Sequence, residues 1–391
     1  HDNVATDSLL RKPSLETREQ LPPVDTTTFS NLPLIDFTEE GAIENYIDSI
    51  DKIKKSAPYD VKAIIKGNGV ASGKTFSRPF ADNDNLVFSK IESASPESIN
   101  SALEILEAYA PTWARTPVEQ RAKVLLSVAD VMESRRYELA AIITLEVGKQ
   151  WIDADADVAE AIDFLRFYAK RAIIDFAPKR LGTSFGEVNE LTYRPYGVAA
   201  VVGPWNFPLA IPAGMFAGAL VSGNCVVLKP AEQSSYIAQV MFRIFIECGM
   251  PNAAAAFLPG DGETVGAPLT KDGRVKLVAF TGSKDVGLSL LGSSVSLANA
   301  KGHIQKIIAE MGGKNAIIVD DGADLDLAIS GIIDSAFGFQ GQKCSACSRV
   351  FVHKSCAPTL IRRLKEAVVS IEVGPSTDPK NMVSAVIDQE S

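Results

Sequence analysis

The chain has 391 residues, of which 46% are hydrophobic and 22% charged, and its formal net charge is −9. This length is too great for one small core and predicts about two or three domains. The acidic balance argues against nucleic acid as the main partner, because phosphate binding needs a basic surface. The five cysteines, an odd number without framework spacing, fit a reducing compartment, so we expect the cytoplasm, or the mitochondrial matrix in a eukaryote.

Residues 1–40 are polar and contain "LPPVDTTTFSNLP", which is typical of a linker or an extended arm. The first residues lack the apolar stretch of a signal peptide. The chain begins with His1 instead of methionine, so we expect a fragment, a processed product or a tagged chain.

The next part of the chain, up to residue 196, predicts strands and then helices. The runs "VKAIIKG" and "NLVFSKI", between residues 60 and 90, alternate like strands. Residues 96–177 carry apolar positions at helical spacing, and Ser95 followed by Pro96 is typical of a helix start. Segment 183–196, with the period-two pattern of "SFGEVNELTY", predicts a hairpin.

From residue 197 the pattern changes to short apolar runs that end at or near glycine or proline, namely "GVAAVVGP", "NCVVLKP", "AAAFLPG" and "VKLVAFTGS". Such runs with helical stretches between them predict buried parallel strands in a doubly wound, Rossmann-type α/β sheet. A second alternating unit follows Glu310, so we expect a cofactor domain at 41–310 and a second α/β domain at 311–391. The stretch between Arg194 and Lys229 has no charged residue, but Pro204, Pro208 and Pro212 within it argue against a membrane span.

The loops after these strands are the expected ligand sites, because ligands of open α/β sheets bind beyond the carboxyl ends of the strands. In "FTGSKDVG", residues 281–283 would open a helix whose amides face a phosphate, although an ordinary capped helix start fits equally well. "PGDGETVG" is one residue longer than the Rossmann glycine pattern and is a weak signal. In "KPAE", Glu232 and Lys229 suit a ribose diol and favour NAD over NADP, and a surface ion pair is the alternative.

The loop "GFQGQKCSACSR" places Cys344 three residues before Cys347. A zinc site is disfavoured because there is no second such pair and the chain has three histidines. A redox pair is disfavoured because the pair follows a helix-like segment, and two inert buried thiols fit poorly with the polar setting. A nucleophile remains, and it needs a base other than histidine.

Two residues elsewhere would serve such a nucleophile. Glu310 lies where a strand would end, and partial desolvation there would raise its pKa enough for a general base; a solvated acid is the alternative. Asn206, between Trp205 and Phe207 in "GPWNFP", would offer an amide to an oxyanion; a simple turn residue is the alternative.

Together the motifs "PWNFP", "KPAE", "FTGS", "EMGGKN" and "GQKCSACSR" resemble those of the aldehyde dehydrogenase superfamily, in the same order and over nearly the whole chain from about residue 60. "FGFQGQKCSACSR" and "GGKNAIIVD" are most similar to the 1-pyrroline-5-carboxylate dehydrogenases. That group oxidises glutamate γ-semialdehyde to glutamate in proline catabolism, in many bacteria as half of a bifunctional protein with proline dehydrogenase. The resemblance implies an aldehyde dehydrogenase fold, NAD as cofactor and no metal. It also implies a homodimer or larger homo-oligomer, with the hairpin at 183–196 as an oligomerisation element.

The resemblance also implies roles for individual residues. Cys344 would attack the aldehyde, Asn206 and the Cys344 backbone amide would hold the oxyanion, and Glu310 would activate water for thioester hydrolysis. The implied substrate contacts are Phe207, Lys343 and Ser345, and Cys347 is a bystander. The implied cofactor contacts are Pro204, Trp205, Lys229, Glu232, Gly262, Gly266, Thr281, Gly282, Ser283 and Val286.

Three alternatives stay open at this point. The chain fits a succinate-semialdehyde dehydrogenase, a general aldehyde dehydrogenase, or an inactive binding module of the same fold. It also lacks the Phe-Gly-Pro segment with which the family holds the nicotinamide ribose. We therefore expect a C-terminally shortened chain that by itself binds NAD weakly and turns over little.

Overall fold

The computed structural model describes residues 29–71, 73–182, 184–301 and 304–391. The chain divides into two units, His1–Asn31 and Leu32–Ser391. Most of the arm expected at 1–40 lies outside the described residues. Its last part is not a free linker, because the backbone N–H groups of Leu32 and Ile35 donate to Asp163 and Asp155, at 2.9 and 2.8 Å.

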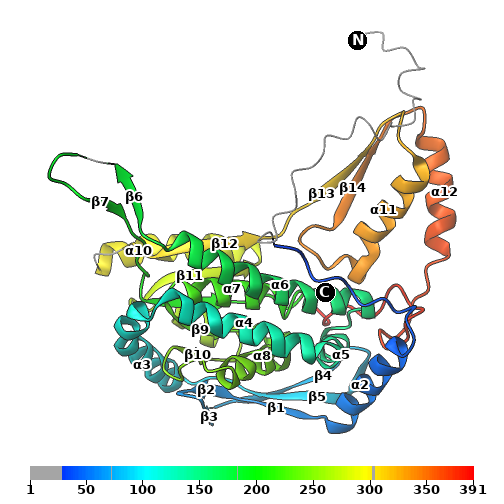
Figure 1. The fold of residues 1–391 in the computed structure, drawn as a ribbon. Helices are drawn as coiled ribbons and strands as arrows, with labels where there is room; N and C mark the ends of the chain where they lie inside the picture. The colour runs from blue at the N-terminus through cyan, green and yellow to red at the C-terminus, as the bar shows by residue number, and fades with distance from the viewer. Residues whose placement is uncertain (1–28, 72, 183, 302–303) are drawn as a thin grey trace. The chain divides into compact units, whose positions relative to one another are not determined.

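Among the described residues, the largest sheet has seven strands in the order β12-β11-β8-β9-β10-β2-β3 (Figure 1). The strands β8 to β12 run parallel to their neighbours, whereas β2 and β3 add antiparallel pairs at one edge. The apolar runs of the sequence form the buried middle strands, which confirms the doubly wound fold. The strands are β2 (Ala63–Ile65), β3 (Asn68–Val70), β8 (Val198–Val202), β9 (Cys225–Lys229), β10 (Ala255–Phe257), β11 (Val275–Gly282) and β12 (Lys306–Met311).

The order of the parallel strands fixes where a ligand would bind. In sequence β8 comes first; β9 and β10 lie on one side of it, and β11 and β12 lie on the other. The winding therefore reverses between β8 and β11, which is the switch point at which Rossmann sheets bind their ligands. The loops that follow these strands meet at this edge, as the sequence predicts.

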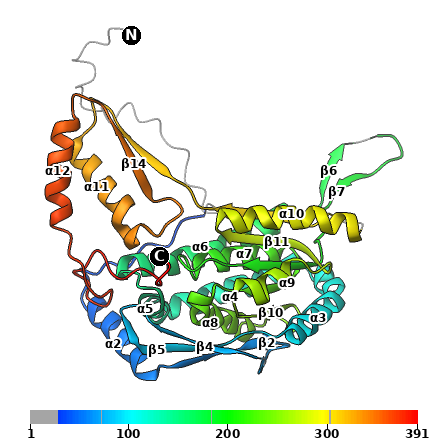
Figure 2. The ribbon, with the colours of Figure 1, turned by 180° about the vertical axis from the view of Figure 1, so that it is seen from behind.

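Helices cover both faces of the sheet. Helix α7 contacts β8 and β9, α6 packs on α7, and α10 lies along β11 and β12 (Figures 1 and 2). The expected helical region is confirmed, and α3 begins where predicted, because the Ser95 hydroxyl accepts from the backbone N–H of Ser98. The helices here are α2 (Ala42–Ser56), α3 (Pro96–Arg115), α4 (Val118–Ser134), α5 (Arg136–Val147), α6 (Trp151–Asp175), α7 (Ala210–Val221), α8 (Ser235–Glu247), α9 (Ala267–Thr270) and α10 (Lys284–Lys301).

Among the described residues, three smaller sheets accompany the main one, and one of them is the parallel pair of β13 (Asn315–Val319) and β14 (Cys347–Val352). The other two come earlier in the chain. Strands β1 (Tyr59–Val61), β4 (Thr75–Phe80) and β5 (Asn83–Glu92) form the first, in the order β1-β5-β4. Strands β6 (Lys179–Gly182) and β7 (Asn189–Leu191) form an exposed hairpin. The predicted bounds of 183–196 were therefore wrong: the first strand precedes that range, because the alternating pattern around residue 190 marks only the second strand.

A small separate core lies within 311–391 and consists of Val319, Ile329, Ile332 and Leu360. It joins β13 (Asn315–Val319), β14 (Cys347–Val352), α11 (Leu325–Phe337) and α12 (Ala357–Val369). The chain after α12 packs on the main core and not on this small one. Ile387 belongs to the main core, and the Ser376 N–H donates to Asp82 at 2.9 Å. The end of the predicted second domain thus packs on the first.

The uncharged stretch between Arg194 and Lys229 forms β8, a turn, α7 and β9. Its apolar residues are buried against the rest of the main core. Within the described parts of the chain, no helix has the length and apolar character needed to span a membrane.

Candidate active site

The loop that carries Cys344 begins with a sharp turn after α11. Phe339, Gln340 and Gly341 have φ values of 49°, 56° and 69°, a left-handed region that favours glycine. Of the three, only Gly341 adopts this conformation without strain, because it has no Cβ. A Cβ added at this position would lie 2.8 Å from the Ala336 carbonyl oxygen. The two other residues hold this conformation through outside contacts. Such strain is concentrated at functional sites, and here it lies directly before the exposed Cys344.

Three anchors hold this turn and the residues after it. The Phe339 side chain is buried in the main core. The Gln340 amide donates to the Ser384 hydroxyl at 2.8 Å and to the Ala385 carbonyl at 2.7 Å. Asn315, from the start of β13, donates to the carbonyl of Cys344 itself at 2.7 Å. The nucleophile candidate thus lies on a loop fixed at both ends.

Asn206 lies close to this loop although it is far from it in sequence. It belongs to the turn 203–208 between β8 and α7 and is half-buried. Its side-chain Nδ2 donates to the backbone carbonyl of Gln342 at 3.0 Å. The structure therefore brings Asn206 to the loop that carries Cys344, two residues before the cysteine.

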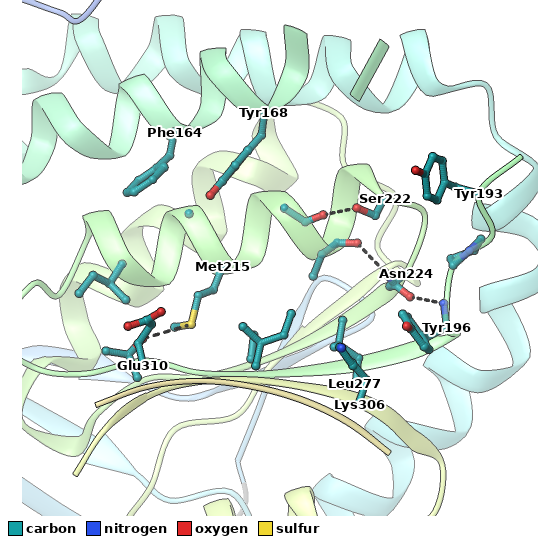
Figure 3. Close-up of a pocket in the computed structure, with 18 of the residues that line it drawn as sticks. Phe164, Tyr168, Tyr193, Tyr196, Met215, Ser222, Asn224, Leu277, Lys306 and Glu310 are labelled. Atoms are coloured by element: carbon teal, nitrogen blue, oxygen red, sulfur yellow. Dashed lines mark hydrogen bonds between the residues drawn. The ribbon is translucent and has the colours of Figure 1, made fainter. Parts of the chain in front are cut away.

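Glu310 lies on β12, directly opposite Thr281 of β11 in the parallel pair. Glu310 and Cys344 both line one cavity of about 570 Å³. Figure 3 shows Phe164 and Tyr168 projecting from α6 toward the side where Met215 and Glu310 lie. The expectation of a partly desolvated carboxylate is wrong: Glu310 is exposed, because β12 is the edge strand of the sheet.

Lys229 is the last residue of β9, and Glu232 lies in the short turn that follows this strand. The Lys229 ammonium is buried and lies 3.3 Å from the Glu232 carboxylate, and burial lowers the pKa of Lys229 below its usual value. The backbone of Gly266 lies beside this lysine, since a Cβ at Gly266 would be 3.9 Å from Lys229 Cε. A carboxylate acceptor beside an ammonium donor at the switch point is a donor set that fits the diol of a ribose.

The other glycine loops have structural explanations of their own. Asp261 caps the turn 262–266 and accepts from the N–H groups of Glu263 and Thr264, at 3.0 and 2.7 Å. These two amides are therefore already bonded. A Cβ at Gly282 would lie 2.6 Å from the Phe280 ring, so close packing explains that glycine.

The start of α10 contains the remaining predicted cofactor residues. The Ser283 hydroxyl accepts from the N–H of Val286 at 3.4 Å, a weak cap of the helix start. Val286 is exposed, and Thr281 faces α7, where its hydroxyl lies 3.6 Å from the Met215 sulfur. The segment is thus a weakly capped helix start, and contact of residues 281–283 with a phosphate stays a prediction.

The remaining predicted residues divide between two places. Ser345 is exposed next to Cys344. The Lys343 ammonium donates to the Asp334 carbonyl at 3.1 Å and lines a different cavity from the one that Cys344 lines. Cys347 begins β14, and its thiol donates to the Arg349 carbonyl at 3.3 Å, which fits a bystander.

Pro204 and Trp205 lie in the same turn as Asn206, and the Trp205 ring packs edge-on against Phe339, with ring centroids 6.3 Å apart. Phe207, the next residue, contacts the buried ammonium of Lys149, which sequence reasoning missed. Sequence reasoning also made no prediction for Asn315 and Gln340, which hold the Cys344 loop. The only available signal was the motif "EMGGKN", whose last residue is Asn315.

Comparison with known proteins shows the family of this chain. The model of the aldehyde dehydrogenase family matches residues 72–391, and the chain belongs to that family. The 1-pyrroline-5-carboxylate dehydrogenase of Geobacillus sp. (strain WCH70) is 35% identical over 363 residues, which are 93% of this chain and 70% of that relative.

Two solved structures are also similar. The proline utilization A (PutA) protein from Bdellovibrio bacteriovorus, inactivated by N-propargylglycine, has a TM-score of 0.92 at 40% identity. That match covers 100% of this chain but 41% of PutA, so the chain spans less than half of it. The 1-pyrroline-5-carboxylate dehydrogenase from Thermus with bound NAD has a TM-score of 0.90 at 36% identity, over 93% of this chain and 70% of that one.

Proposed function

We propose that this protein is an NAD-dependent L-glutamate γ-semialdehyde dehydrogenase, acting on the aldehyde that forms from 1-pyrroline-5-carboxylate. The observation that carries the proposal is the hydrogen bond of Asn206 to the Cys344 loop, together with the cavity that Cys344 and Glu310 both line. The choice of this aldehyde rests on the names of the relatives, at 35 to 40% identity.

The three side chains divide the chemistry among them. The Cys344 thiolate attacks the aldehyde carbon, and its backbone N–H and the Asn206 amide hold the oxyanion of the resulting thiohemiacetal. When bound, NAD supplies the acceptor for the hydride that leaves this carbon. Glu310 then takes a proton from water, which attacks the thioester carbonyl and releases the carboxylate product and the Cys344 thiolate. Its exposed place on β12 gives water direct access.

We assign the cofactor to the switch-point loops. Glu232 would accept from the ribose hydroxyls and Lys229 would donate to them. A carboxylate at this place also repels the extra phosphate of NADP, which supports NAD as the cofactor. Pro204 and Trp205 would lie against the nicotinamide half.

We further propose that the protein forms a homo-oligomer through the hairpin β6–β7. Leu181 of β6 and, in the turn after it, Phe185 and Val188 are exposed, which supports a partner surface. The similarity to PutA supports a fusion with a proline dehydrogenase. The five free cysteines support a reducing compartment, the cytoplasm or the mitochondrial matrix.

The decisive experiment measures NADH formation from pyrroline-5-carboxylate by the full-length protein. We expect turnover that Cys344→Ala abolishes and that is at least tenfold slower on succinate semialdehyde. Equal or faster rates on succinate semialdehyde would contradict the substrate. An unchanged rate in Cys344→Ala would contradict the nucleophile.

A further inference from the structure

A lysine buried behind the two active-site loops has no role in the chemistry above. Lys149 follows Gly148, the residue that ends α5, and its side chain is 1% exposed. Its ammonium lies 2.8 Å from Asp157 Oδ2 on α6, and the Asp157 side chain is fully buried. Buried charges are rare in proteins because they are costly to remove from water, so this pair needs an explanation.

Asp157 connects the pair to the loop of Asn206. Its other oxygen, Oδ1, accepts from the backbone N–H of Ala210 at 2.7 Å. Ala210 is the first residue of α7, just after the turn 203–208. The carboxylate therefore fixes the point at which that turn enters the helix.

The ammonium of Lys149 contacts one aromatic ring from each active-site loop. It lies 3.8 Å from the centroid of Phe207 and 5.1 Å from that of Phe339. A cation over a ring face is attracted by the electrons of the ring, and the attraction is stronger when water is excluded. Phe207 is the neighbour of Asn206, and Phe339 lies in the strained turn before Cys344.

An ion pair that only stabilised the fold would not need to contact these two aromatic rings. A pair of apolar side chains of similar volume would stabilise a core as well as a buried ion pair does. A neutral side chain, however, would lose the attraction to both rings. The charge therefore has its effect at the place where the two loops meet.

We propose that Lys149 is a positioning residue that clamps Phe207 and Phe339 and so fixes Asn206 relative to Cys344. This inference rests on the proposed function and extends it. An oxyanion donor must lie within a few tenths of an ångström of its place in the transition state. Loosening the clamp therefore lowers kcat by about 10- to 100-fold and leaves KM within about threefold.

The test uses three variants at the pair. Lys149→Met removes the charge at similar length, and Lys149→Arg keeps a cation that reaches Asp157 and the rings. The double variant Lys149→Met/Asp157→Asn removes both charges and keeps an acceptor for the Ala210 N–H. Arg136→Met is the matched control, because Arg136 pairs at 2.5 Å with Asp155, also buried on α6, and touches neither loop.

The expected result separates positioning from stability. Lys149→Met lowers both Tm and kcat; the double variant regains most of the Tm but not the kcat; Lys149→Arg recovers part of the kcat. Arg136→Met lowers Tm and leaves kcat within about twofold. If kcat instead follows Tm through the series, or if the double variant recovers full kcat, the clamp is refuted.

Hydrogen exchange provides a test that needs no turnover. In Lys149→Met, peptides that cover 203–209 and 338–344 exchange faster, while peptides of α3 and α4 do not change. Unchanged exchange in both loops overturns the clamp. A wild-type protein that does not oxidise glutamate semialdehyde overturns the proposed function instead, and the exchange comparison still decides the clamp.

Discussion

The buried carboxylate of Glu146 makes the stability of the fold depend on pH. Glu146 lies at the end of α5, 3% exposed, and its two oxygens accept from the backbone N–H groups of Tyr236 and Ile237, at 2.8 and 2.9 Å. These amides belong to the first turn of α8, so the side chain caps that helix from a distance. Burial raises the pKa of Glu146 to about 7, although the two amides act in the opposite direction.

The direction of the effect follows from linkage. The pKa of Glu146 is raised in the folded protein, from a usual value of 4.5 to about 7. The folded state therefore binds the proton more tightly, and the resulting stability is complete below about pH 4.5 and is lost as the pH rises to 7. A difference of about 2.5 pKa units corresponds to roughly 3 kcal/mol of unfolding free energy, as an order of magnitude.

The variant Glu146→Gln does not titrate, and its NH₂ group faces one of the two N–H donors. The free energy of unfolding of this variant is therefore lower by a constant amount, about 1–3 kcal/mol, at every pH. Urea unfolding at pH 5, 6, 7 and 8 is the assay, with the exposed Glu107→Gln on α3 as control. We expect the wild type to lose roughly 3 kcal/mol relative to Glu146→Gln between pH 5 and 8. Parallel curves for the two proteins would refute the reasoning and mean that the two amides offset the effect of burial on the pKa of Glu146.

Three further predictions concern the site. Asn206→Ala lowers kcat about 100- to 1,000-fold in the NADH assay, because one oxyanion donor is lost; a change below about threefold would contradict its role. Glu232→Gln narrows the preference for NAD over NADP about tenfold or more, measured as the ratio of the two kcat/KM values; an unchanged ratio would place the ribose elsewhere. Iodoacetamide modifies the exposed Cys344 before Cys225, because burial raises the pKa of Cys225 to about 12; mass spectrometry of partly labelled protein decides, and equal labelling would contradict it.

The sequence is a good guide to the sheet because each strand carries its own signal. Runs such as "GVAAVVGP" are apolar throughout and end at residues that stop a strand. The hairpin β6–β7 gives a weaker signal, since both of its strands are exposed and have no buried face. Its first strand therefore cannot be located from alternation alone.

The site is predictable only where a motif is continuous in sequence. Glu310 was placed correctly at the end of a strand, but its exposure depends on β12 being an edge strand, which is a property of the whole sheet. Lys149 follows the end of a helix, where a basic residue is usually solvated. Its partners Phe207 and Phe339 are distant in sequence, and only folding brings the three together.

The hydrogen bond between Asn206 and the Gln342 carbonyl also affects how the site responds to motion. It joins the loop of the oxyanion donor to the loop of the nucleophile, so a displacement of one is transmitted to the other. The amide has a second N–H that this bond does not use, which remains available to an incoming oxygen. An aspartate at this position would have neither hydrogen and would repel the carbonyl, so the connection between the loops requires the neutral amide itself.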